Sequence, residues 1–168
     1  MDKKLFLTCY QFTKKHPYFE KCILFTGKIL PQLVMLLYFI FLFLLIQTKN
    51  SFLVQSIAVP FITLVIVTII RKIVDRKRPF EVFPIVSAIS HNKGNSFPSR
   101  HTASAFIIAV TIMHYHLLWG IFFLVIAFII GISRVMLGLH FPLDVLAGAV
   151  ISLVIGYFGF FFNQTVIF

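Results

Sequence analysis

The sequence predicts an all-α integral membrane protein, a bundle of about five transmembrane helices preceded by an interfacial amphipathic helix. Two bulk properties support this fold class. Of the 168 residues, 60% are hydrophobic and 12% are charged, whereas about a quarter of a soluble domain is charged. The mean hydropathy is +0.99. The third observation is the pattern: the apolar residues form long runs that short polar segments separate.

Residues 1–28 are predicted to form an interfacial basic amphipathic segment. Lysines are mixed here with leucine, phenylalanine and tyrosine, a composition too polar to span a bilayer but typical of a helix that lies at the headgroups. A break is expected near Pro17, because proline cannot continue a helix from the preceding turn. The alternative is a flexible basic tail.

Residues 29–168 are predicted to form the transmembrane domain. The first apolar run ends at Gln47, and its length as a helix, about 28 Å, is close to the thickness of a bilayer's hydrocarbon core. The expected spans cover residues 29–47, 51–70, 102–118, 121–136 and 142–162. Because successive spans cross in opposite directions, three segments meet on one side of the membrane: residues 1–28, 71–101 and 134–141.

All five arginines fall in three clusters on this side, at residues 71–78, 98–101 and 133–144. The planar fork of arginine suits phosphate oxygens, so the clusters indicate phosphate binding. The alternative is that these charges only mark topology, but lysine would then serve equally, and the lysines are spread more widely. The net charge of +10 therefore indicates a phosphorylated lipid or anionic headgroups as partner, and no nucleic acid.

The second cluster places a serine and a histidine at the expected start of a helix. Ser99 is a favourable N-cap, and His101 would lie in or beside the first turn. Backbone N–H groups at a helix N-terminus attract anions. His101 is therefore a candidate to donate a proton to the leaving oxygen of a bound phosphate.

The third cluster contains the only two charged residues between positions 102 and 168, Arg134 and Asp144. Charge at membrane depth is costly and is retained where it is paired or used. Pro142 fits the first turn of the last helix, which places His140 just before the helix and Asp144 within its first turn. A carboxylate there can accept from one ring nitrogen of His140 and leave the other as a nucleophile.

The three clusters resemble the signature motifs of the type 2 phosphatidic acid phosphatase family, which shares its site with vanadium haloperoxidases and glucose-6-phosphatase. The third family motif is Ser-Arg, five residues, His, three residues, Asp. It is matched in full by Ser133, Arg134, His140 and Asp144.

The other two motifs match with one departure each. Residues 98–101 match Pro-Ser-Gly-His, except that Arg100 stands where glycine is usual. The first motif, Lys, six residues, Arg-Pro, matches at Arg78 and Pro79, with Arg71 where lysine is usual.

The resemblance implies a phosphohistidine mechanism that uses no metal and no other cofactor. It implies that His140 is the nucleophile, that Asp144 orients it and that His101 is the general acid. Phosphate oxygens would be held by five residues: Arg71, Arg78, Ser99, Arg100 and Arg134.

The expected function is therefore that of a membrane lipid phosphatase. The first candidate substrate is undecaprenyl diphosphate; phosphatidylglycerophosphate and phosphatidic acid are alternatives. An alternative of another class is a non-catalytic membrane protein that binds lipid phosphate, such as a permease subunit. The expected location is the cell membrane. The lysine and arginine count favours a cytoplasmic catalytic face, whereas the resemblance implies an extracytoplasmic one, which we adopt as the expectation. Oligomeric state is left unpredicted.

Overall fold

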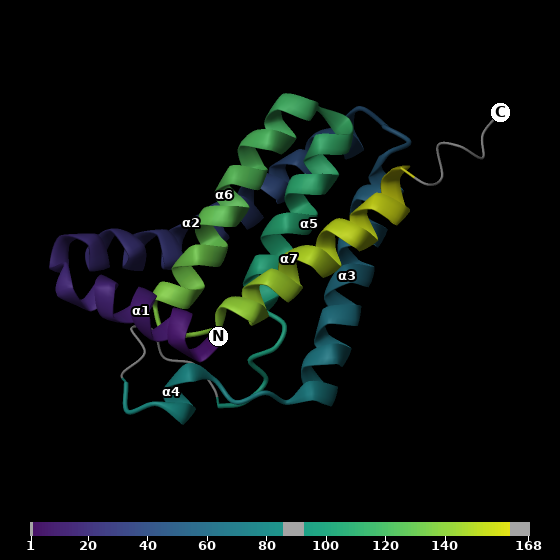
Figure 1. The fold of residues 1–168 in the computed structure, drawn as a ribbon. Coiled ribbons are helices and arrows are strands. Elements are labelled where there is room, and N and C mark those ends of the chain that lie inside the picture. The colour runs from purple at the N-terminus through teal and green to yellow at the C-terminus, as the bar shows by residue number, and fades with distance from the viewer. Residues whose placement is uncertain (1, 86–92, 162–168) are drawn as a thin grey trace.

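The structure, a computed structural model, describes residues 2–85 and 93–161 (Figure 1). The described part is mainly helical and contains no strand. Its elements in chain order are α1 (Asp2–Lys15), α2 (Pro17–Gln47), α3 (Leu53–Val74), α4 (Pro79–Val82), α5 (Arg100–Tyr115), α6 (Leu117–Met136), α7 (Pro142–Gly156) and the π-helical turn η1 (Tyr157–Phe161).

The N-terminal third forms a short helix followed by a long one. Pro17 occupies the start of α2, where its missing N–H costs nothing, and the chain bends at His16. The 31 residues of α2 reach about 46 Å, which exceeds a hydrocarbon core of about 30 Å. Residues 17–28, expected within the interfacial segment, are thus the first turns of α2, and α1 alone precedes it.

Four helical stretches of the described chain are long and apolar enough to cross a membrane: Pro17–Gln47, Leu53–Val82, Leu117–Met136 and Pro142–Phe160. The remaining expected span corresponds to α5, which has 16 residues. α5 packs against α2, α3, α6 and α7. Because these neighbours shield it from lipid, its length need not match the bilayer. The break before the next span falls at His116 rather than at Trp119, which lies in the first turn of α6.

The core lies around α5, and the outer faces are apolar. Ala105, Ala109 and Ile112 of α5 are buried against α2 and α6. Large side chains such as Phe39, Phe61 and Phe128 are more than half exposed, which suits contact with lipid tails.

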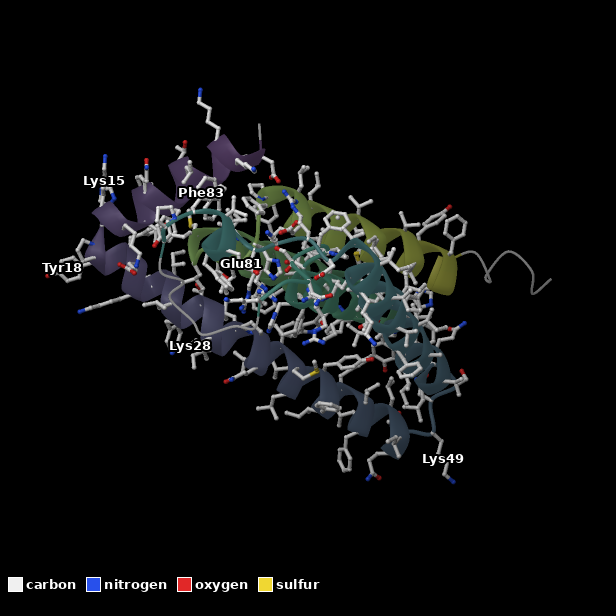
Figure 2. All side chains as sticks on the ribbon, turned by 90° about the horizontal axis from the view of Figure 1, so that it is seen from below. Lys15, Tyr18, Lys28, Lys49, Glu81 and Phe83 are labelled. Atoms are coloured by element: carbon white, nitrogen blue, oxygen red, sulfur yellow. The ribbon has the colours of Figure 1, made fainter. Side chains whose placement is uncertain are left out.

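The polar segments lie together at one end of the bundle. Figure 1 shows α4, the end of α3 and the start of α7 at the same end as α1, whereas the α5–α6 turn lies at the other. Figure 2 views the molecule from the polar end; Glu81 lies between α1 and α2, Phe83 lies near α1, and Lys15 and Tyr18 lie at the corner between α1 and α2. This arrangement brings the three arginine clusters together, as the crossing count required.

Candidate active site

A cavity of about 320 Å³ opens at the polar end of the bundle. It is lined by residues from all three clusters and from the segment before α5: Thr68, Arg71, Lys72, Arg78, Lys93, Gly94, Asn95, Arg100, His101 and His140. Five of these side chains are cationic, and no carboxylate lies among the described lining residues. The cavity therefore suits a compact, multiply charged anion.

His140 lies at the buried side of this cavity, held by a tight turn after α6. Gly138 adopts φ +76°, a conformation that favours glycine, and this lets the chain reverse between α6 and α7. The backbone N–H of His140 then donates to the Arg134 carbonyl. The His140 residue is 1% exposed, so its ring is fixed by packing and still borders the cavity.

Asp144 stands behind His140 in the first turn of α7. Its Oδ2 lies 3.6 Å from His140 Nδ1, too far for a direct hydrogen bond. Ser96 lies between them: its Oγ is 2.5 Å from Asp144 Oδ2 and 3.4 Å from His140 Nδ1. Asp144 Oδ2 also accepts from the Phe141 N–H at 2.8 Å. The carboxylate is thereby held on the Nδ1 side of the ring, which leaves Nε2 for chemistry.

Arg71 and Arg78 line the cavity and are oriented by backbone carbonyls. Arg71 Nη1 donates to the Pro98 carbonyl at 2.8 Å. Arg78 Nε donates to the Gly94 carbonyl at 3.1 Å, and the side chain is buried. Each guanidinium has further N–H groups beyond these bonds, so both can hold an anion while remaining fixed.

Arg100 and His101 form the α5 side of the cavity. Arg100, the residue in the glycine position of the motif, is exposed and forms no ion pair with the described acidic side chains. His101 borders both the cationic cavity and a small cleft of about 60 Å³ between α2 and α5, whose other lining residues are mostly apolar. The His101 side chain thus lies at the boundary between a polar cavity and an apolar cleft.

Ser99 and Arg134 do not line the cavity. Ser99 is the residue before α5, but its hydroxyl makes no capping bond to the helix; it accepts from Thr102 Oγ1 at 3.0 Å. The Ser99 N–H donates to the Asp144 carbonyl at 2.8 Å, which ties the second cluster to the third. Arg134 is 2% exposed and its Nη2 donates to the Gly27 carbonyl of α2. Its buried Nε has no hydrogen-bond partner in the described chain.

Burial decides the protonation state of His140. Loss of hydration lowers the pKa of the imidazole to about 4, and the cations Arg78 and Arg71 act in the same direction, whereas Asp144 opposes them. The ring is therefore neutral at neutral pH, the form a nucleophile requires. Within the described residues, no group of three or more His, Cys, Asp or Glu side chains is placed to hold a metal ion.

Sequence reasoning assigned no site role to three residues at or near Asp144: Ser96, Arg76 and Asp2, although Arg76 was counted in the first arginine cluster. Arg76 Nη1 donates to Asp144 Oδ1 at 2.6 Å. Arg76 lies inside the first motif and Ser96 three residues before Ser99, so position relative to the motifs was the available signal. Asp2 lies far from every motif, and no sequence signal marks it.

Comparison with known proteins identifies the family. The family model described as the PAP2 superfamily matches residues 52–167. The chain is 38% identical over 115 residues to the bacitracin transport permease protein BcrC of Bacillus licheniformis; the match covers 67% of this chain and 57% of that protein. It is 32% identical over 87 residues to the undecaprenyl-diphosphatase BcrC of Bacillus subtilis (strain 168), covering 52% and 45%. The matches thus span about half the length of these relatives.

A solved structure agrees with these sequence matches. LpxE of Aquifex aeolicus superposes with a TM-score of 0.78 at 27% identity, covering 93% of this chain and 92% of that one. The structure is therefore a multi-pass membrane fold shared with a solved protein over nearly all of both chains. Since the family model covers more than half of the sequence, the chain belongs to the PAP2 superfamily.

Proposed function

We propose that this chain is a lipid phosphatase that hydrolyses a phosphate or diphosphate ester through a phosphohistidine, without a metal ion. The observation that carries the proposal is that a buried, neutral His140 is paired with Asp144 beside a cavity. The described lining of this cavity contains five cationic side chains and no carboxylate. Phosphoryl transfer needs positioning and charge neutralisation above all, and guanidinium groups supply both.

In this mechanism Nε2 of His140 attacks phosphorus while the bond to the leaving oxygen breaks. Asp144 stabilises the positive charge that develops on the ring, with Ser96 between them at hydrogen-bonding distance from the carboxylate. His101 protonates the leaving oxygen. Water then attacks phosphorus and gives a proton to the now neutral His101, the bond from phosphorus to Nε2 breaks, and phosphate leaves with both histidines restored.

Arg71, Arg78, Arg100, Ser99 and Arg134 are proposed to hold the phosphate, in different ways. The first three border the cavity and can reach an anion directly. Ser99 ties α5 to Asp144 through its N–H, which supports a role in setting the cavity's shape. Arg134 does not border the cavity, and it is kept in the set because it matches the arginine of the third family motif.

The proposed substrate is an amphiphilic diphosphate, with undecaprenyl diphosphate as the first candidate. Arg100, Lys72 and Lys93 add three cations to Arg71 and Arg78, more than one phosphoryl group requires. The name of the Bacillus subtilis relative, an undecaprenyl-diphosphatase, supports the same choice. The apolar cleft beside His101 suits the start of a lipid chain. Phosphatidylglycerophosphate and phosphatidic acid are the alternative substrates.

The test is phosphate release by the full chain in detergent with EDTA present. The substrates are undecaprenyl diphosphate, phosphatidylglycerophosphate, phosphatidic acid and a soluble phosphate ester, and His140→Ala is the negative control. We expect release from the diphosphate to exceed release from the others and to be lost in His140→Ala. Full activity in that variant would refute the nucleophile assignment.

A non-catalytic role is the second candidate, because the Bacillus licheniformis relative is named a transport permease protein. Such a protein needs cations for headgroups but not the His140–Asp144 pair. Vanadate mimics pentacoordinate phosphorus, so it is expected to inhibit phosphate release if the chain is a phosphatase. A folded protein that releases no phosphate from any substrate would instead favour the permease role.

We further propose that the chain resides in the cell membrane with its catalytic face outside the cytoplasm, as the family resemblance implies. Single cysteines at Lys77 and Lys49, in a chain with Cys9 and Cys22 changed to serine, report the two ends of the bundle. A membrane-impermeant maleimide added to intact cells is expected to label position 77 and not position 49. The reverse pattern would place the catalytic face inside.

A further inference from the structure

The side chain of Arg76, which lies outside the cavity, forms an ion pair with the carboxylate of Asp144. Arg76 lies in the loop after α3 and does not border the cavity. Its guanidinium bridges two carboxylates: Nη1 donates to Asp144 Oδ1 at 2.6 Å, and Nη2 donates to Asp2 Oδ2 at 2.6 Å. The Asp144 side chain is fully buried, so this bond is shielded from water and stronger than a surface ion pair.

Asp2 joins the same network from the start of α1. Its Oδ1 accepts from the Leu143 N–H at 3.0 Å, in the first turn of α7 and next to Asp144. The guanidinium of Arg76 also lies 4.4 Å from the centroid of the Phe141 ring. Asp2 therefore fixes both Arg76 and the helix turn that carries Asp144.

Apolar contacts hold α1 in the place that this network needs. Phe6 is fully buried, and its ring lies 5.4 Å from that of Phe141. Tyr10 packs in the same cluster, and a Cβ on Gly138 would lie 3.2 Å from its ring. The helix expected to lie on the membrane surface thus also covers the loop that presents His140.

We propose that Arg76 and Asp2 are positioning residues for the reaction, acting through Asp144 on His140. This inference rests on the proposed function, in which His140 is the nucleophile. Arg76 fixes Oδ1 of Asp144, while Ser96 and the Phe141 N–H fix Oδ2 on the side facing Nδ1. The carboxylate then cannot rotate away as the ring becomes positively charged.

The charges of Arg76, Asp144 and Asp2 explain why one arginine pairs with two carboxylates. Arg76 alone would neutralise Asp144 and weaken its attraction for a cationic ring. Asp2 offsets the charge of Arg76, so Asp144 keeps its effect on His140. The other charged groups that act on His140, Arg78 and Arg71, belong to the cavity wall and are unchanged by substitutions at Arg76 or Asp2.

The test compares Arg76→Gln, Asp2→Asn and the double variant with two matched controls. Lys77→Gln removes the neighbouring exposed cation, and Glu20→Gln removes an acid that pairs with Lys14 at the α1–α2 corner, away from Asp144. The assay measures kcat, KM and the pH profile of kcat/KM for phosphate release by the full chain in detergent.

We expect Arg76→Gln to lower kcat about ten- to hundredfold, the usual effect of losing a group that orients a catalytic ligand, with KM unchanged because Arg76 does not touch the cavity. Asp2→Asn should lower kcat less, and the double variant should match Arg76→Gln, because asparagine keeps the Oδ1 acceptor for the Leu143 N–H and loses only the charge that acts through Arg76. The acid limb of the pH profile should move up in Arg76→Gln, which loses a cation, and down in Asp2→Asn, which loses an anion.

Several results would overturn the inference: unchanged kcat in Arg76→Gln, losses that multiply in the double variant, or an acid limb that does not move. An inactive wild-type chain would instead count against the proposed function. In that case histidine ¹⁵N NMR in detergent tests the inference without an activity measurement. The His140 signals should change in Arg76→Gln and Asp2→Asn but not in the controls. Unchanged His140 signals would overturn it independently of activity.

Discussion

Replacement of Ser96 by alanine tests how the catalytic pair is joined. The Ser96 hydroxyl is fully buried, donates to Asp144 Oδ2 at 2.5 Å and lies 3.4 Å from His140 Nδ1. The direct distance from Nδ1 to Oδ2 is 3.6 Å. In Ser96→Ala the ring therefore loses the group that bridges it to the carboxylate, while Asp144 keeps its bonds from Arg76 and Phe141.

The expected size of the effect follows from the hydrogen bond that is removed. A hydrogen bond to a charged group contributes about 1.5–3 kcal/mol. Since about 1.4 kcal/mol corresponds to a factor of ten in rate, kcat should fall about ten- to hundredfold. KM should stay close to the wild-type value, because Ser96 does not line the cavity.

Steady-state phosphate release in detergent provides the measurement. Ser152→Ala is the matched control: Ser152 is also fully buried, but its hydroxyl joins α7 to the Ala103 carbonyl of α5, away from His140. The control should lose stability without loss of kcat. A wild-type kcat in Ser96→Ala would refute the reasoning and would mean that His140 contacts Asp144 directly in the working enzyme.

Four further predictions concern pH and packing. Because burial lowers the pKa of His140 to about 4, the acid limb of kcat/KM should lie well below pH 6.5; a limb centred near 6.5, after allowance for substrate ionisation, would contradict this. The unfolded chain takes up a proton on this ring at about pH 6.5, so the free energy of unfolding should be highest above that pH and fall as the pH drops toward 4, as denaturant titrations can check. A Cβ at Gly148 would lie 2.6 Å from the Ser99 carbonyl oxygen, so Gly148→Ala should cost about 1–3 kcal/mol in unfolding and lower activity, whereas Leu153→Ala on the exposed face of α7 should leave activity intact. Arg134→Gln should cost about 1–3 kcal/mol, because the buried Gly27 carbonyl loses its donor; an unchanged thermal midpoint would show that this bond is dispensable.

Much of the fold could be predicted from hydropathy and helix-end signals. Long apolar runs identify spans because only a helix satisfies its own backbone in lipid. Pro142 begins α7 and Ser99 precedes α5, as expected of those residue types. The extent of α2 could not be predicted, because Gly27 and Pro31 are weak helix formers, and close packing of α2 on Leu137 favours the continuous helix.

The candidate site divides in the same way. Motif spacing and the crossing count were enough to predict that Arg71, Arg78, His101 and His140 share one end of the bundle, and all four line the cavity. The role of each residue stays a prediction. Arg134 shows the limit: its position in the chain follows from the motif, but the direction of its side chain depends on α2, whose Gly27 carbonyl accepts from it across 107 positions.

The sequence by itself determined the class of protein, the approximate spans and the residues with chemistry, because these depend on composition and on spacing within single segments. Tertiary structure alone decided what surrounds Asp144. Ser96 and Asp2 are ordinary residues in the sequence, yet they approach Asp144 and Arg76 from 48 and 74 positions away. Their roles arise from how two helices, α1 and α7, pack with the loops after α3 and before α5 at one end of the bundle, and no local pattern specifies such long-range contacts.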